Sequence, residues 1–303
     1  MRKFYLENEK GERRGLNGEQ GIRLGNPAGL GVVFTRKSSE IGNGFLRVEE
    51  VRLKNEPVTC DLTFLPDAYA RYRQLVNWIA GSRTLYLIYC PYGEQEFRAL
   101  CALQYLTKKE LSRGKWLVVP SALERLSPWY LAEPAQIAMS GPDEGAKGYF
   151  WDEDEQDYGY RYDAKLHYGA ETEGLAALIA PSGHEPSGLV LRILGAISDP
   201  VIRLVGQSSG TEYGRCVIDS ERDPLAVFGA SDTLELSTRD DDAHVRKIAA
   251  DGTVTDLLNA VRLELGDPYP KAPTTETALL TVESSTAADC SASLQVYHYY
   301  WTV

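Results

Sequence analysis

Two runs of carboxylates are the residues of this chain whose spacing could support metal or acid–base chemistry. Residues 152–157 read DEDEQD, and residues 239–242 read RDDD. Hard cations favour clustered carboxylates, but neither run has the alternating ligand positions and the turn glycine of a calcium loop. We interpret the first run as a solvated acidic face and the second as a turn between strands.

The histidines offer no better candidate for catalysis, because none has a second histidine three or four residues away. His298 alternates with Leu294 and Val296, which predicts a packed strand position, and His184 lies in the turn-rich stretch PSGHEPSG. No glycine-rich phosphate loop opens a helix, and GTEYG and GASDT do not form a nucleophile elbow. We therefore predict no catalytic, cofactor-binding or metal-binding residue, and no cofactor. The four histidines are His167, His184, His244 and His298.

The five cysteines are odd in number and widely scattered, which favours buried thiols in a reducing compartment over disulfides. None of their spacings is that of a zinc site. They are Cys60, Cys90, Cys101, Cys216 and Cys290.

The scaffold of the first half is centred on residues 58–105, which read as strand, helix, strand and strand. The apolar residues of VTCDLTF alternate with polar ones, as in a strand with one buried face. Asp67 is placed to cap the following helix and Gly81 to end it. The helix is expected to pack on a sheet through an apolar stripe of Tyr69, Tyr72, Leu75, Val76 and Ile79.

The elements around this centre complete a first domain at residues 1–135. FYLENEKGERRGL predicts a hairpin that turns at Lys10-Gly11. Residues 29–37 and 45–53 read as strands, and residues 38–43 as a long polar loop that could meet a neighbouring subunit. With one helix among about six or seven strands, the domain is expected to be α+β, a barrel-like or sandwich-like sheet with one packed helix.

The second half changes character. Residues 136–174 are dense in Gly, Tyr and carboxylates and read as an acidic, Tyr-rich linker or arm. Residues 175–303 contain eight short strand patterns separated by turn signals, including Asp251-Gly252. This predicts a β-sandwich or jelly roll, so the fold class is mainly β.

Charge separates the two halves. The first 135 residues hold 20 lysines and arginines against 15 acidic residues, and the rest hold 12 against 28. The acidic half would repel nucleic-acid phosphates, and the positive excess of the first half is too dispersed to predict DNA binding. We expect no membrane insertion and no secretory signal, because no apolar run reaches about 20 residues and the N-terminus is charged almost throughout, with no apolar h-region.

Several features, taken in order, resemble the distal tail (Dit) proteins of tailed phages and prophages over nearly the whole chain. They are the hairpin FYLENEKGERRGLNG, the helix DAYARYRQLVNWIAG with the strand LYLIYCPYG, the ending SPWY where the family has TPWY, the Tyr- and Asp-rich stretch YFWDEDEQDYGYRYD, and the later strands GAISDPVIRLVG and TLELSTRDDDAHVRKIAADGTVTDLL.

The resemblance implies a non-enzymatic virion protein of the tail tip, made in the host cytoplasm. The family's first domains form a homo-hexameric ring, and a galectin-like second domain projects outward. The ring joins the tail tube to the baseplate hub. The implied partners are further copies of the chain, the major tail tube protein, the tape-measure protein, the tail-associated lysin or hub protein, and often receptor-binding proteins.

Two other functions stay open at this stage. A carbohydrate-binding sandwich for host-surface attachment could stack sugars on Trp151, Trp301 and the tyrosines between Tyr149 and Tyr168. A glycan-degrading enzyme is the weakest of the alternatives. The distance between its two catalytic carboxylates is set by the folded structure, so spacing along the sequence neither indicates nor excludes such a pair.

Overall fold

The computed structural model describes residues 2–43, 45–91, 95–112, 114–139, 174–263, 267–287 and 290–303. The chain divides into two compact units, each treated separately below. The N-terminal unit comprises Met1–Glu133 and Tyr299–Val303, and the C-terminal unit comprises Pro134–His298. The last five residues, which the sequence places with the second domain, thus return to the N-terminal unit. Most of the expected acidic linker, residues 136–174, lies outside the described residues.

The described part of the N-terminal unit is built from ten short strands and one helix. In chain order they are β1 (Lys3–Asn8), β2 (Arg13–Gly15), β3 (Ile22–Ala28), β4 (Val32–Gly42), β5 (Phe45–Asn55), β6 (Val58–Phe64), α1 (Ala68–Ala80), β7 (Leu85–Cys90), β8 (Phe97–Leu106), β9 (Leu117–Arg125) and β10 (Trp129–Leu131).

Seven of these strands form an antiparallel barrel in the order β3-β6-β9-β8-β7-β1-β2. The residues after β2 close it. The Leu16 N–H donates to the Phe4 carbonyl at 2.9 Å, and the Leu24 N–H donates to the Leu16 carbonyl at 2.7 Å. Closure leaves the barrel strands without a free edge along this circuit. The predicted barrel-like domain is confirmed.

Alternation along the strands fills the barrel. In β6, Val58 and Phe64 have no exposed surface, and the polar residues between the apolar ones point outward, as predicted. Trp129 of β10 is also fully buried against this core. At the end of β20, Tyr299 and Tyr300 pair with β10, which ties the C-terminus into the N-terminal unit.

Helix α1 packs on the barrel through the predicted stripe, with Leu75 buried and Tyr69, Tyr72 and Ile79 partly buried against the core. The predicted side-chain cap is wrong. Asp67 has a φ of 52° and makes no side-chain cap bond; its carbonyl, rather than its carboxylate, accepts the first helical N–H groups. A left-handed residue aims its side chain away from the helix N-terminus, so composition at this position misled the prediction.

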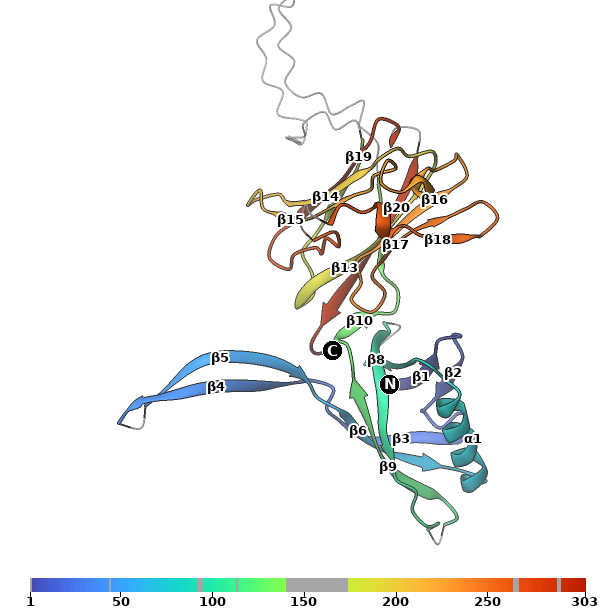
Figure 1. The fold of residues 1–303 in the computed structure, drawn as a ribbon. Helices are drawn as coiled ribbons and strands as arrows, with labels where there is room; N and C mark the ends of the chain where they lie inside the picture. The colour runs from blue at the N-terminus through green and yellow to red at the C-terminus, as the bar shows by residue number, and fades with distance from the viewer. Residues whose placement is uncertain are drawn as a thin grey trace, which may run out of the picture. The chain divides into compact units, whose positions relative to one another are not determined.

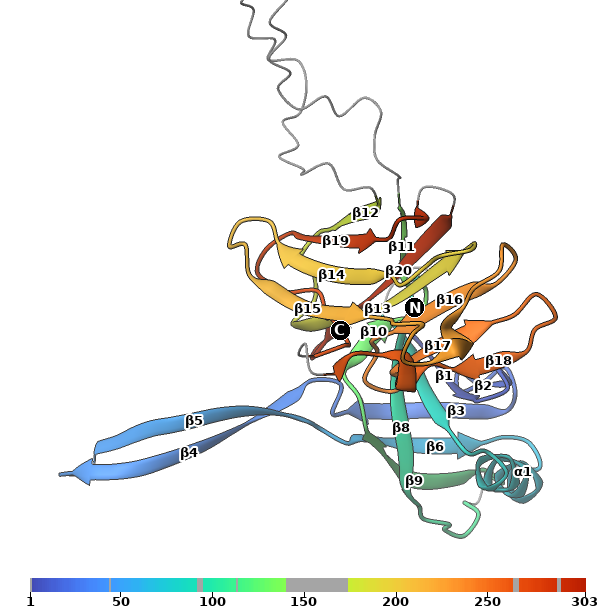
Figure 2. The same cartoon turned by 45° about the horizontal axis from the view of Figure 1, so that its top comes forward.

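Strands β4 and β5 pair only with each other, as a two-stranded ribbon. Figures 1 and 2 show this ribbon extending beyond the barrel strands in both views. We call it the arm. The predicted polar loop at residues 38–43 is wrong, because β4 runs to Gly42 and Ser38 pairs with Val48. Main-chain hydrogen bonds hold a ladder whatever the side chains are, so polar composition alone does not indicate a loop.

The described part of the C-terminal unit is built from strands and short 3₁₀ turns. Its elements are β11 (Ala135–Ala138), β12 (Gly174–Ile179), β13 (Glu185–Leu194), β14 (Val201–Gly206), β15 (Glu212–Val217), η1 (Pro224–Ala226), β16 (Thr233–Ser237), β17 (His244–Ile248), β18 (Val254–Asp256), η2 (Leu258–Ala260), β19 (Ala278–Glu283) and β20 (Ser291–Tyr300).

Two sheets enclose the core of this unit. One has the order β18-β17-β16-β13-β20 with β11 beyond β20, and the other has the order β12-β19-β14-β15. Leu191 and Leu236 of the first sheet and Ile202 and Leu280 of the second belong to one buried cluster. The predicted sandwich is confirmed, and its eight strand patterns all form strands. In the described part of the chain, no helix is long and apolar enough to cross a bilayer.

Candidate functional site

The carboxylate run at residues 239–242 lies in the turn between β16 and β17, as predicted. Arg239 and Asp241 form an ion pair of 2.5 Å within this turn, and the Arg239 guanidinium lies 4.4 Å from the centre of the Tyr297 ring. These contacts order the turn. The other run, at residues 152–157, lies outside the described residues, as does His167.

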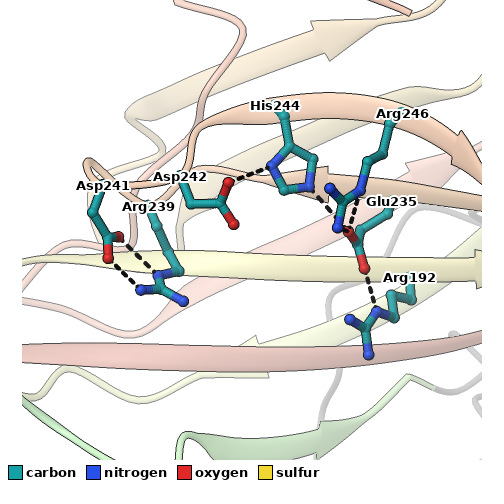
Figure 3. A network of polar contacts seen from close by, with 7 residues as sticks. All are labelled: Arg192, Glu235, Arg239, Asp241, Asp242, His244 and Arg246. Atoms are coloured by element: carbon teal, nitrogen blue, oxygen red, sulfur yellow. Dashed lines mark hydrogen bonds and ion pairs between the residues drawn. The ribbon is translucent and has the colours of Figure 1, made fainter. Parts of the chain in front are cut away.

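Glu235 of β16 anchors a network of polar side chains across three strands (Figure 3). Its side chain is 1% exposed and is paired with Arg192 of β13 and with His244 and Arg246 of β17. His244 Nε2 lies 3.0 Å from Glu235 Oε1, and Arg246 Nη2 lies 2.5 Å from the same oxygen.

The electrostatics of Glu235 indicate a structural role. Burial by itself would raise the pKa of the Glu235 carboxyl, but hydrogen bonds from Arg192 and His244 outweigh burial and lower it. A buried carboxylate held ionised by three partners is a poor proton donor at neutral pH. The network therefore ties strands together and is a poor candidate for acid–base catalysis.

The remaining candidates also have structural roles. His298 Nδ1 lies 2.9 Å from the Ser187 hydroxyl, and burial lowers its pKa, while His184 is exposed. All five cysteines are free thiols, and four are buried as predicted. Burial raises the pKa of Cys60, Cys101 and Cys216 to about 12, which keeps them protonated and unreactive. Among the described residues, no three His, Cys, Asp or Glu side chains gather as a metal site.

The arm is the feature best suited to an interaction. Phe34, Phe45 and Leu46 are 61%, 69% and 67% exposed, and Ile41 is 66% exposed. Large apolar side chains at such exposure on an isolated ribbon mark a surface that another chain covers. These exposed apolar side chains suit the arm to contact with another protein surface.

Sequence reasoning missed the side chain that holds the root of the arm, Arg125 at the end of β9. A signal for it exists in the sequence. Leu117, Val119 and Leu123 are buried in β9, and Arg125 occurs at the same alternating parity with 3% exposure. An arginine at a core position is rare unless its guanidinium is hydrogen-bonded.

Most of the aromatic residues that the sequence offers for carbohydrate binding, Trp151 and the tyrosines between residues 149 and 168, lie outside the described residues. Trp301 is half-buried in the N-terminal unit. A different aromatic hollow lies in the C-terminal unit. Its cavity of about 290 Å³ is lined by Tyr213, Tyr269, Lys271 and Thr274 among others.

Comparison with known proteins accords with these observations. Residues 3–124 match the family model of the distal tail protein, N-terminal domain. A solved structure of the phage P2 baseplate in its activated conformation with Ca matches at 13% identity and a TM-score of 0.63, covering 100% of both chains. The same baseplate with Sr matches at 13% identity and a TM-score of 0.60, again over 100% of both chains.

A third structure is that of phage SPP1 Dit (gp 19.1), described as a paradigm of the hub adsorption apparatus in Gram-positive-infecting phages. It matches at 8% identity and a TM-score of 0.57, covering 97% of this chain and 98% of that one. No curated protein sequence matches the chain. At these identities the structures establish the fold, and the family model establishes the N-terminal domain. The chain therefore carries the N-terminal domain of the distal tail protein family, within a fold that it shares over its whole length with phage baseplate proteins.

Proposed function

We propose that this chain is the subunit of a homo-hexameric ring at the distal end of a phage tail. Each subunit lays its arm on the next copy, and the ring joins the tail tube to the baseplate hub. The observation that carries the proposal is the arm, which lies within the matched residues 3–124 and leaves large apolar side chains uncovered in the single chain.

The register of the arm gives it two different faces. Glu40 pairs with Leu46, and Ser38 with Val48, so Leu46 and Val48 share a face, and the alternation of β4 adds Phe34 to it. The opposite face carries the basic residues Lys37, Arg47, Arg52 and Lys54 together with Glu50. Two charged residues, Arg36 and Glu40, lie on the same face as Phe34 and Leu46. An amphipathic ribbon of this kind suits one apolar partner surface and one acidic or solvated surface.

A second copy of the chain fits both requirements. A contact between an arm and a different patch on the next subunit is heterologous, and heterologous contacts close into a ring when the rotation permits. The chain also carries its own charge complement, since residues 136–303 hold 28 acidic against 12 basic side chains. The arm's basic face can therefore meet acidic surface on a neighbour without a further partner.

The ring works by shape, and we propose no catalytic step for it. Its further partners are the tail tube, tape-measure and hub or lysin proteins, with receptor-binding proteins held at the periphery, and its location is the virion. The acidic C-terminal unit would face those peripheral partners through polar contacts.

Mass photometry of the full chain tests the proposal with a pair of arm variants. Leu46→Asp places a charge on the apolar face, and Ser39→Asp places the same charge on the opposite face at a neighbouring rung. We expect the wild type to form closed oligomers, Ser39→Asp to form them at a somewhat higher concentration because its carboxylate is added to the basic face, and Leu46→Asp to remain a single chain. Equal assembly of the two variants would rule out docking through this face.

Saccharide binding is a second candidate, and the hollow at Tyr213 and Tyr269 is what favours it. Half-buried tyrosine rings beside threonine, lysine and aspartate side chains supply stacking and hydrogen bonding for a pyranose ring. The Tyr213 hydroxyl is fixed by Glu276 Oε1 at 2.6 Å. Glycan-array binding that Tyr269→Ala abolishes would support this role, and a blank array for the wild type would dismiss it.

A further inference from the structure

The root of the arm is held by side chains of the barrel. Arg125 Nη2 donates to the carbonyl of Gly31, just before β4, and Arg125 Nε donates to the carbonyl of Glu56, just after β5, at 3.3 Å. The Trp129 indole N–H donates to the Leu30 carbonyl at 3.2 Å. One buried guanidinium thus bridges the two strands of the arm at the point where they leave the barrel.

The local backbone makes this root tight. Gly29 has a φ of +80°, and a Cβ added there would lie 2.0 Å from the Pro57 carbonyl oxygen. Only glycine fits such an approach, so the incoming and outgoing chains pass each other with no room for a side chain. The Arg125 guanidinium also lies 5.2 Å from the centre of the Trp129 ring, which fixes its orientation.

Burying the Arg125 guanidinium costs desolvation free energy. The residue is 3% exposed, and no ion pair among the described residues includes it. Burial lowers the pKa of Arg125 to about 10. A leucine or methionine would fill the same core position without the cost of desolvating a charge. What the arginine supplies, and an apolar residue cannot, is a fork of donors that reaches two carbonyls on different strands.

We propose that Arg125 is the positioning residue of the arm: it fixes the direction in which the ribbon leaves the barrel, so that docking on a neighbouring copy costs little orientational freedom. The second part of this inference rests on the proposed ring function, whereas the first concerns a single chain. Without the bridge that Arg125 makes between the carbonyls of Gly31 and Glu56, the ribbon would be freer to pivot about residues 29–31 and 56–57 and would lose more freedom on docking.

The direction of the arm can be measured in a single chain. Spin labels on non-natural residues at Lys37, in the arm, and at Lys109, in the β8–β9 loop, report one distance by pulsed electron resonance. A large excess of unlabelled chain keeps the measured distances within one molecule. We compare wild type with Arg125→Met, which has similar length and no donors, and with Arg125→Lys.

Arg98→Met is the matched control. Arg98 also belongs to the barrel, pairs with Glu7 at 2.8 Å and lies 3.8 Å from the Tyr86 ring centre, but none of its described contacts is with the arm. We expect a narrow distance distribution for wild type and Arg98→Met, a broad one for Arg125→Met and an intermediate one for Arg125→Lys. The concentration for half-assembly should rise about tenfold in Arg125→Met, which corresponds to about 1.4 kcal/mol.

A narrow distribution in Arg125→Met, or equal broadening in Arg98→Met, overturns the inference. If Arg125→Met does not fold, Arg125→Lys and Trp129→Phe decide the question, because each weakens only part of the same root; narrow distributions in both overturn it. If the wild type never assembles but the distance distribution is broader in Arg125→Met, the positioning role is supported and the proposed ring is wrong. If Arg125→Met broadens the distance distribution but assembles at the wild-type concentration, the direction of the arm does not affect assembly.

Discussion

Tyr72→Asp should strongly destabilise the N-terminal unit, because Tyr72 holds α1 against the barrel. Its ring meets Phe64 edge-on at 5.8 Å, and its hydroxyl donates to the Leu106 carbonyl at 3.1 Å. For a half-buried ring we take about half of the 3–5 kcal/mol that a buried aromatic costs on truncation. The aromatic pair and the hydrogen bond add about 1 kcal/mol each, for a total of about 4 kcal/mol.

Urea unfolding followed by tryptophan fluorescence measures this loss. The tryptophans among the described residues, Trp78, Trp116, Trp129 and Trp301, all belong to the N-terminal unit, so the signal reports mainly on that unit. With a slope of about 2 kcal/mol per molar urea, the midpoint should fall by about 2 M.

Two controls isolate the cause. Tyr72→Phe removes only the hydroxyl and should cost about 1 kcal/mol. Gln74→Asp adds the same negative charge on an exposed helix position and should cost less than about 0.5 kcal/mol. If Tyr72→Asp unfolds at the wild-type midpoint, α1 does not pack through this stripe and our account of the helix is wrong.

Three further predictions concern the titratable groups. Because the folded-state pKa of Glu235 is lowered, its ion pairs stabilise the fold above about pH 4.5, and this stabilisation is lost as pH falls through the folded pKa. Glu235→Gln should lower the free energy of unfolding by about 1.5–3 kcal/mol at pH 7. The variant should also lose part of the acid sensitivity that tyrosine near-ultraviolet circular dichroism measures. Hydrogen bonds from the Ser209 and Tyr213 hydroxyls lower the pKa of Glu276 to about 2, so its carboxyl resonance should titrate near pH 2, and a midpoint near 4.5 would show that this loop is open in solution. A thiol reagent at pH 8, followed by peptide mass mapping, should label Cys290 first and leave Cys60, Cys101 and Cys216 unlabelled, whereas rapid labelling of those three would contradict their burial.

Much of the fold could be predicted because it follows local alternation. The period-2 pattern of β6 and the helical stripe of α1 correspond to faces that are buried in the structure. The arm was misjudged at residues 38–42 because its ladder depends on main-chain hydrogen bonds and its surface is exposed, so the side chains carry no burial pattern. Barrel closure through Leu16 depends on main-chain hydrogen bonds to Phe4 and Leu24, and main-chain groups carry no side-chain pattern that would predict it.

The candidate site divides in the same way. That the chain has no catalytic residue stays a prediction, and among the described residues Glu235 is held by Arg192, His244 and Arg246. The role of Arg125 could not be inferred from its neighbours in sequence, because Gly31 and Glu56 come to it only when the arm folds back on itself. The available signal was that Arg125 lies on the same side of β9 as Leu117 and Leu123, and this signal is informative only once that side is known to face the core.

The most direct test of the ring is the mass and symmetry of the particle that the full chain forms. Native mass spectrometry should give six times the chain mass of 33.6 kDa, and electron micrographs should show six-fold rings. Leu46→Asp should give the single-chain mass under the same conditions. A single-chain mass for the wild type at every concentration, or rings that Leu46→Asp leaves intact, would contradict assembly through the arm.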